Sequence, residues 1–271
     1  MKIRVVSDLH VDLNAEYYGI TTQEIIDKLN LDNMDMLILA GDTAEYPENL
    51  KFIKQVSERY PELKIIEIPG NHLYYSCQKF WLRIKDADKL CKYYMQENKN
   101  YYFLNKNSIV IDGIKFIGAT MWTKCGEYSG QRVAIQNGLN DFRYIINDNY
   151  ESITVDDVIE LHEEQKKFIV SELNKSEEKC VVITHHAPFF EYHSELSHAF
   201  GIDLDRTLKK LKHYPEYWIY GHTHINKEKT LEYENGNIKC VTNQMGYKGE
   251  TLYSEAFNAW STFDSNKEIE L

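Results

Sequence analysis

The sequence has no apolar stretch long enough to cross a bilayer, so we expect neither a membrane-spanning segment nor a membrane partner. It has no internal repeat and no low-complexity tract, which argues against a solenoid and against a disordered chain. The chain enters an apolar run at residues 3–6 without the charged leader and cleavage site of a secretory signal. We therefore expect a cytoplasmic protein.

Cysteine is scarce and lacks the spacing of a structural framework. The five cysteines are odd in number, and none forms a CxxC pair. This pattern favours reduced thiols over disulfides, again as in a cytoplasmic protein.

Basic residues are fewer than acidic ones. The chain has 31 lysine and arginine residues against 42 acidic ones, for a net charge of −11, and it contains no basic run. Such a surface repels a polyanion and disfavours binding of long nucleic acid. A small phosphorylated substrate is still compatible with it, because bound metal ions reverse the local field.

Apolar residues are plentiful, at 43% of the chain, and suffice for a large core. Short apolar runs alternate with amphipathic stretches, which indicates an α/β architecture. We predict one domain, residues 1–271, with an insertion at about residues 121–150 near the active site. The expected buried strands are 3–6, 36–39, 65–68, 181–184 and 218–220, and the expected long helices are 22–29, 47–60, 78–96 and 154–173.

Five short motifs follow these strands directly, and each contains side chains that bind metal ions. They are Ser7-Asp8-Leu9-His10, Gly41-Asp42-Thr43-Ala44-Glu45, Gly70-Asn71-His72, Thr184-His185-His186-Ala187-Pro188 and Gly221-His222-Thr223-His224. In open α/β sheets, ligands collect outside the carboxyl ends of the strands. Each motif alone is weak evidence, but their shared position after a strand predicts one metal site.

In this order the motifs resemble the signature of the calcineurin-like metallophosphoesterases: DxH, GDxx(D/E), GNH, a histidine after a later strand, and GHxH. The resemblance extends from Asp8 to His224. It implies a four-layer αββα sandwich, in which two mixed β-sheets pack face to face between helices. Residues 118–123, 139–143 and 243–250 further resemble a poorly characterised bacterial branch, which implies that the insertion covers the active site.

The resemblance also implies a dinuclear metal centre. One metal ion would be bound by Asp8, His10 and His224. The other would be bound by Asn71, His185 and His222, with the Asp42 carboxylate bridging both. A set of carboxylate, imidazole and amide ligands suits two divalent ions such as Mn²⁺, Fe, Zn²⁺ or Co²⁺.

His72 corresponds to a histidine of the family that does not bind metal, contacts the phosphate and protonates the leaving group. The choice between the neighbours His185 and His186 stays open, with motif alignment favouring His185. Glu45 fits a supporting role better than direct ligation.

We therefore predict a phosphoesterase that hydrolyses a small phosphate mono- or diester by attack of a hydroxide held between two metal ions. Two alternatives stay open: a non-catalytic scaffold of the same fold, and a cyclic-nucleotide phosphodiesterase within the same class. A phosphoprotein phosphatase is disfavoured because no Arg-Gly pair follows the Asp42 motif. The sequence predicts no oligomeric state.

Three cations of the insertion, Lys124, Arg132 and Arg143, either contact the phosphate of the substrate or lie in solvent. His162 lies in an expected helix among acidic neighbours, and we expect it to be exposed.

Overall fold

Two mixed β-sheets form the centre of the computed structural model, which describes residues 1–75, 77–191, 196–250 and 258–271. The first sheet has the strand order β11 (Glu268–Glu270), β1 (Lys2–Val6), β2 (Met36–Ala40), β3 (Lys64–Ile68) and β4 (Tyr101–Phe103). The second has the order β5 (Asn107–Ile111), β6 (Ile114–Ala119), β7 (Lys179–Thr184), β8 (Tyr217–Ile219), β10 (Gly236–Val241) and β9 (Lys229–Tyr233).

Within the first sheet β1 to β4 run parallel, and in the second β6, β7, β8 and β10 run parallel. The edge strands β11, β5 and β9 are antiparallel to their neighbours. Parallel strands whose two faces are both covered read as continuous apolar runs. This is why β2, with the sequence MLILA, is buried throughout.

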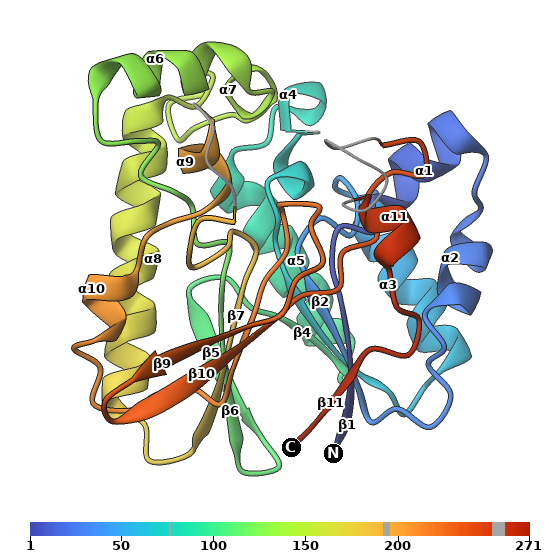
Figure 1. The fold of residues 1–271 in the computed structure, drawn as a ribbon. Coiled ribbons are helices and arrows are strands. Elements are labelled where there is room, and N and C mark those ends of the chain that lie inside the picture. Colours follow the sequence, from blue (N-terminus) through green and yellow to red (C-terminus); the bar gives the residue numbers. More distant parts are fainter. Residues whose placement is uncertain (76, 192–195, 251–257) are drawn as a thin grey trace.

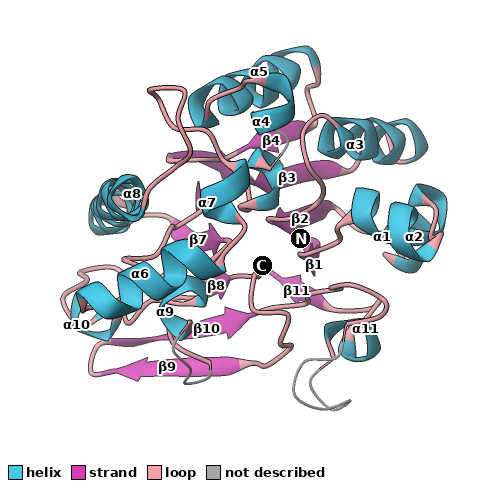
Figure 2. Ribbon diagram, turned by 90° about the horizontal axis from the view of Figure 1, so that it is seen from above, coloured by secondary structure: helices cyan, strands magenta, loops and turns pink. Residues whose placement is uncertain are grey.

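Helices cover the outer face of each sheet (Figures 1 and 2). On the first sheet these are α1 (Val11–Tyr18), α2 (Thr22–Lys28), α3 (Glu48–Arg59) and α5 (Ile84–Glu97). The long helix α8 (Val155–Lys175) lies on the second sheet together with α10 (Asp205–Leu208). Shorter helices are η1 (His72–Tyr74), α4 (Cys77–Phe80), α6 (Ser129–Gly138), α7 (Asp141–Tyr144), α9 (Ser197–Phe200) and α11 (Ala259–Thr262).

The core has three apolar layers, one at each interface between the four structural layers. The middle layer joins the two sheets, with Ile38 and Ile66 from one and Phe116 and Ile183 from the other. The outer layers join each sheet to its helices. The predicted four-layer αββα sandwich is therefore confirmed.

Capping boxes fix the starts of two helices, and one expected helix is divided in two. Thr21 with Glu24 and Thr154 with Asp157 form capping boxes at the starts of α2 and α8. The single helix expected at residues 78–96 is wrong, because α4 ends at Phe80 and α5 starts at Ile84. Trp81 separates them with φ 51°, a left-handed conformation that a helix does not continue through.

The segment at residues 121–150 contains α6 and α7, which lie above the carboxyl ends of the strands (Figure 1). None of the helices in the described part of the chain is both long enough and apolar enough to cross a membrane.

Candidate metal centre

The five motifs meet at one edge of the sandwich. Asp8 and His10 follow β1, Asp42 follows β2 and Asn71 follows β3, while the two histidine motifs follow β7 and β8 of the other sheet. Because these strands are parallel within each sheet, their carboxyl ends lie together. The fold thus brings all seven predicted ligand residues and His72 to one place.

The first cluster consists of Asp8, His10 and His224, whose donor atoms lie within 4.8 Å of one another. The Nε2 atoms of His10 and His224 are 3.2 Å apart, and His224 Nε2 is 3.4 Å from Asp8 Oδ1. All three residues are buried.

The second cluster consists of Asp42, His185 and His222, again with donor atoms within 4.8 Å. His185 Nε2 lies 3.3 Å from Asp42 Oδ2 and 3.1 Å from His222 Nδ1. The amide oxygen of Asn71 joins this cluster, at 3.0 Å from His185 Nε2.

Asp42 lies between the two clusters. Its Oδ2 atom is 3.8 Å from His10 Nε2 on one side and 3.3 Å from His185 Nε2 on the other. A carboxylate in this place can serve two cations at once.

Two of the imidazoles are neutral. Burial lowers the pKa of His10 and of His222 well below its ordinary value, and neighbouring imidazoles act in the same direction. The opposite nitrogens, His10 Nδ1 and His222 Nε2, are buried and have no hydrogen-bond partner among the described residues. Neutral imidazoles fit a metal site, because a metal ion binds the unprotonated ring.

The other two imidazoles are held by carboxylates. Burial acts to lower the pKa of His185, but Asp42 outweighs it and raises that pKa to about 9. Burial also opposes protonation of His224, yet Asp8 and Glu250 raise its pKa to about 10. A divalent cation could take the place of the proton on each ring and be neutralised by the same carboxylates. The donor set therefore fits two metal ions.

The backbone at the centre is strained. Asp8, His10, Asp42, His222 and His224 all have positive φ, between 40° and 72°. Residues other than glycine rarely adopt this conformation, and such residues gather at functional sites. Five of the seven predicted ligands therefore share a positive φ, which is a conformation typical of functional sites.

Two motif glycines leave room for the ligands. A Cβ atom at Gly70 would lie 2.0 Å from Asp42 Oδ1, and one at Gly41 would lie 2.1 Å from His185 Nδ1. Any larger residue would displace these side chains, which explains a glycine at each position.

His72 stands beside the bridging carboxylate and belongs to η1. Its Nε2 atom is 4.0 Å from Asp42 Oδ2, and its ring stacks on Tyr75 with centroids 4.1 Å apart. The His72 backbone N–H donates to Asp42 Oδ1 over 2.9 Å. The ring faces the cavity of the centre, where it can reach a bound ligand.

The structure separates His185 from His186. His185 Nε2 faces Asn71 and Asp42, whereas His186 Nδ1 is 3.2 Å from the carbonyl oxygen of Thr120. Burial lowers the pKa of His186 to about 3, and its ring packs against Trp122. The geometry therefore favours His185 as the ligand.

The expectation that His162 is exposed is wrong. It is 1% exposed, and its Nδ1 lies 2.6 Å from the carbonyl oxygen of Trp122. Its acidic neighbour Glu163 is exposed even though its carboxylate lies 3.7 Å from His162 Nε2, so the local charge pattern does not report the burial of the ring.

Two carboxylates that support the ligands were not predicted from the sequence. Glu250 Oε2 is 2.5 Å from His224 Nδ1, and Asp141 Oδ1 accepts a hydrogen bond from the Asn71 amide over 2.9 Å. Both lie in segments that resemble relatives, residues 139–143 and 243–250, but nothing in the sequence assigns them a partner. Glu45, in contrast, belongs to none of the metal-binding clusters among the described residues.

The centre opens into a cavity of about 380 Å³, a size suited to a small organic ligand. Besides the metal-centre residues, its lining includes Tyr75, Leu139, Asp141, Leu196, Phe200, Ile225, Tyr247 and Glu250. Part of the predicted insertion, residues 138–141, thus lines the cavity.

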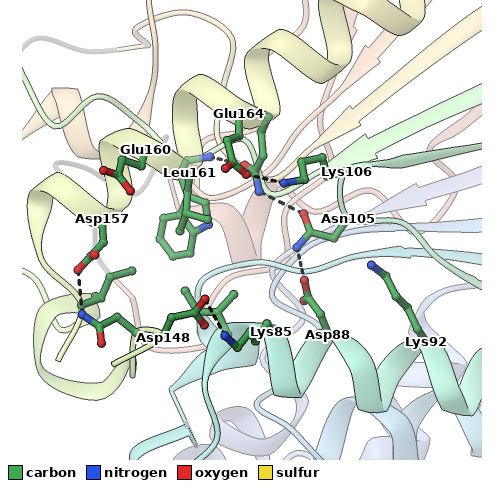
Figure 3. A pocket seen from close by; sticks show the side chains of 15 residues that line it. Lys85, Asp88, Lys92, Asn105, Lys106, Asp148, Asp157, Glu160, Leu161 and Glu164 are labelled. Carbon is green, nitrogen blue, oxygen red and sulfur yellow. Dashed lines mark hydrogen bonds and ion pairs between the residues drawn. The ribbon is translucent and has the colours of Figure 1, made fainter. Parts of the chain in front are cut away.

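A second cavity of about 360 Å³ lies between α5 and α8 (Figure 3). None of the predicted metal-binding residues lines it. Several of its polar side chains pair with one another: Lys85 Nζ is 2.8 Å from Asp148, Lys106 pairs with Glu164, and the Asn105 amide donates to Asp88. Because the predicted metal-binding residues are absent from this lining, the cavity at the metal centre is the better candidate for chemistry.

Solved structures of low sequence identity share this fold. A dimetal phosphatase from Danio rerio superposes with a TM-score of 0.53 at 10% identity, covering 90% of this chain and 87% of that one. The protein TT1561 of Thermus thermophilus superposes with a TM-score of 0.50 at 13% identity, covering 91% of this chain and 89% of that one.

Sequence comparison identifies a relative and a family as well as the fold. The uncharacterised protein L509 of Acanthamoeba polyphaga mimivirus is 30% identical over 283 residues, which covers 97% of this chain and 96% of the relative. The sequence profile of the calcineurin-like phosphoesterases matches residues 1–226, which include every residue of the two clusters. The chain therefore belongs to the calcineurin-like phosphoesterase family.

Proposed function

We propose that this protein is a phosphoric ester hydrolase that binds two divalent cations and hydrolyses a small phosphate mono- or diester. The observation that carries the proposal is the meeting of the first and second clusters at Asp42, within a cavity large enough for a small substrate. Family membership supports the same reaction class. The mixed nitrogen and oxygen donors suit Mn²⁺, Fe, Zn²⁺ or Co²⁺.

When bound, the two cations would supply Lewis acidity and an activated water for displacement at phosphorus. The first cluster would hold one cation, and the second cluster with Asn71 would hold the other. Asp42 would balance charge between them, and Glu250 would fix the ring orientation of His224 through its short contact.

His72 would act as the general acid. Its ring is fixed by stacking on Tyr75 and faces the cavity, 4.0 Å from the Asp42 carboxylate. A histidine that faces the cavity beside the metal centre can pass a proton to the leaving oxygen of a bound ester.

The test combines elemental analysis with hydrolysis of p-nitrophenyl phosphate and bis(p-nitrophenyl) phosphate. We expect about two metal ions per chain and activity on at least one ester, lost on chelation and restored by a divalent cation. Asp42→Asn should reduce both metal content and activity. A protein that binds no metal and has no activity with any added divalent cation would instead be a scaffold.

We also place the enzyme in the cytoplasm. Cys91, Cys125, Cys180 and Cys240 are all buried free thiols, as is usual in a reducing compartment. Fractionation of cells that express the tagged protein tests this assignment, and recovery in the secreted fraction would contradict it.

A further inference from the structure

Histidines are the only basic side chains among the described residues that line the cavity of the metal centre. No lysine or arginine is among its described lining residues. The remaining segments, residues 76, 192–195 and 251–257, contain neither residue in their sequences. Beyond the metal-binding set, the charged groups that the described lining can offer are the carboxyl groups of Asp141 and Glu250 and the imidazole of His72.

The cations of the insertion lie elsewhere. Lys124 pairs with Glu127, and the Arg132 guanidinium donates to the carbonyl oxygen of Gly126 over 3.5 Å. Arg143 is exposed and donates to the carbonyl oxygen of Asn137 over 3.1 Å. None of the three lines the cavity, so they give a bound phosphate no direct contact there.

Apolar side chains instead stand beside each cluster. Phe200 stacks on His222 of the second cluster with ring centroids 5.0 Å apart, and Leu139 and Leu196 line the same cavity. Tyr247 stacks on His10 of the first cluster with centroids 4.4 Å apart. Each half of the centre therefore has an aromatic wall of its own.

Building on the hydrolase function above, we propose that the substrate is a phosphodiester with a single negative charge and two uncharged ester groups, at least one of them a ring. A monoester dianion or a polyphosphate would bring extra charge into a cavity whose described lining has no lysine or arginine to pair with it. A diester brings one charge and two organic groups, which suit a lining with the aromatic ring of Tyr247 and the apolar side chains of Leu139 and Leu196.

Binding of two inert anions tests the charge argument without turnover. Phenylphosphonate is a dianion at alkaline pH and imitates a monoester, whereas diphenylphosphinate is a monoanion with two rings and imitates a diester. We expect calorimetry on the manganese-loaded protein to give at least about tenfold tighter binding of diphenylphosphinate. Equal or tighter binding of phenylphosphonate would overturn the proposal.

Hydrolysis gives a second, matched comparison. We expect kcat/KM for bis(p-nitrophenyl) phosphate to exceed that for p-nitrophenyl phosphate. Leu139→Arg, which places a cation on the cavity wall, should lower this ratio by about tenfold. Val133→Arg puts the same side chain on the exposed face of α6 and should leave the ratio unchanged. Ile225→Arg repeats the test at another lining position if Leu139→Arg does not fold.

The outcomes separate the two proposals. Preference for the monoester, with a ratio that neither arginine variant lowers, would overturn the diester assignment and leave the hydrolase function intact. Metal-loaded protein that binds neither anion and hydrolyses neither ester would contradict the hydrolase function itself.

Discussion

The side-chain amide of Asn71 donates a hydrogen bond to the carboxylate of Asp141 over 2.9 Å, and the Tyr75 hydroxyl donates to the same oxygen over 2.6 Å. Because the amide nitrogen is held by Asp141, the amide oxygen is turned toward His185, 3.0 Å from its Nε2. A residue of the insertion thus orients a candidate metal ligand that lies 70 positions earlier in the chain.

Asp141→Ala should weaken metal binding at the second cluster. Without the carboxylate, the Asn71 amide can rotate and present its nitrogen, which does not bind a cation. Loss of such a supporting contact typically costs about 10–100-fold in metal affinity, measurable by competition with a chelator. Asp148→Ala changes an exposed carboxylate of the same segment and serves as the control. Equal affinities of the two variants would show that Asp141 does not orient Asn71.

Glu250→Gln should affect the first cluster in the same way. The carboxylate contacts His224 Nδ1 at 2.5 Å and so fixes which ring nitrogen faces the metal. We expect elemental analysis to show loss of about one metal ion per chain, with the other ion retained. Glu234→Gln, in the exposed turn between β9 and β10, is the matched control. Full retention of both ions in Glu250→Gln would argue against this contact as a support.

The neighbours His185 and His186 should respond differently to the same substitution. His185→Gln removes a nitrogen that faces Asp42 and Asn71, so metal content should fall. His186→Gln alters a buried ring against Thr120 and Trp122, so metal should remain while the free energy of unfolding falls by about 1–3 kcal/mol. Elemental analysis and urea denaturation together distinguish the two; metal loss in His186→Gln alone would reverse the assignment.

Glu67 should make stability depend on pH. Burial raises the pKa of this carboxyl to about 7, although hydrogen bonds from Tyr101 and Asn49 act in the opposite direction. Because the folded state holds the proton more tightly than the unfolded chain, its stabilising effect is full at pH below about 4.5 and is lost as pH rises through about 7.

Glu67→Gln does not titrate, so the free energy of unfolding of this variant relative to the native protein should rise by roughly 2–3 kcal/mol between about pH 5 and pH 8. Urea denaturation of the metal-saturated proteins at several pH values measures the difference. Glu62→Gln, an exposed substitution just before β3, should show no such trend. A constant difference between Glu67→Gln and the native protein across this range would contradict the raised pKa.

The sequence determined the features that depend on neighbours along the chain. The apolar runs predicted the central strands because a strand buried on both faces needs apolar residues at every position, as in β2. The motif residues follow these runs directly, and parallel strands deliver their carboxyl ends to one edge. The place of Asp8, Asp42 and His222 together at that edge was therefore predictable from local order alone.

Only the tertiary structure decided the contacts between distant segments. Asp141 and Glu250 lie outside the strand-end motifs, so their positions depend on how the insertion and the C-terminal segment fold over the centre. The choice between His185 and His186 depends on the direction in which β7 ends, and the burial of His162 depends on the packing of α8 against Trp122. Local sequence sets which groups are available, whereas side-chain direction and burial follow from packing of elements far apart in the chain.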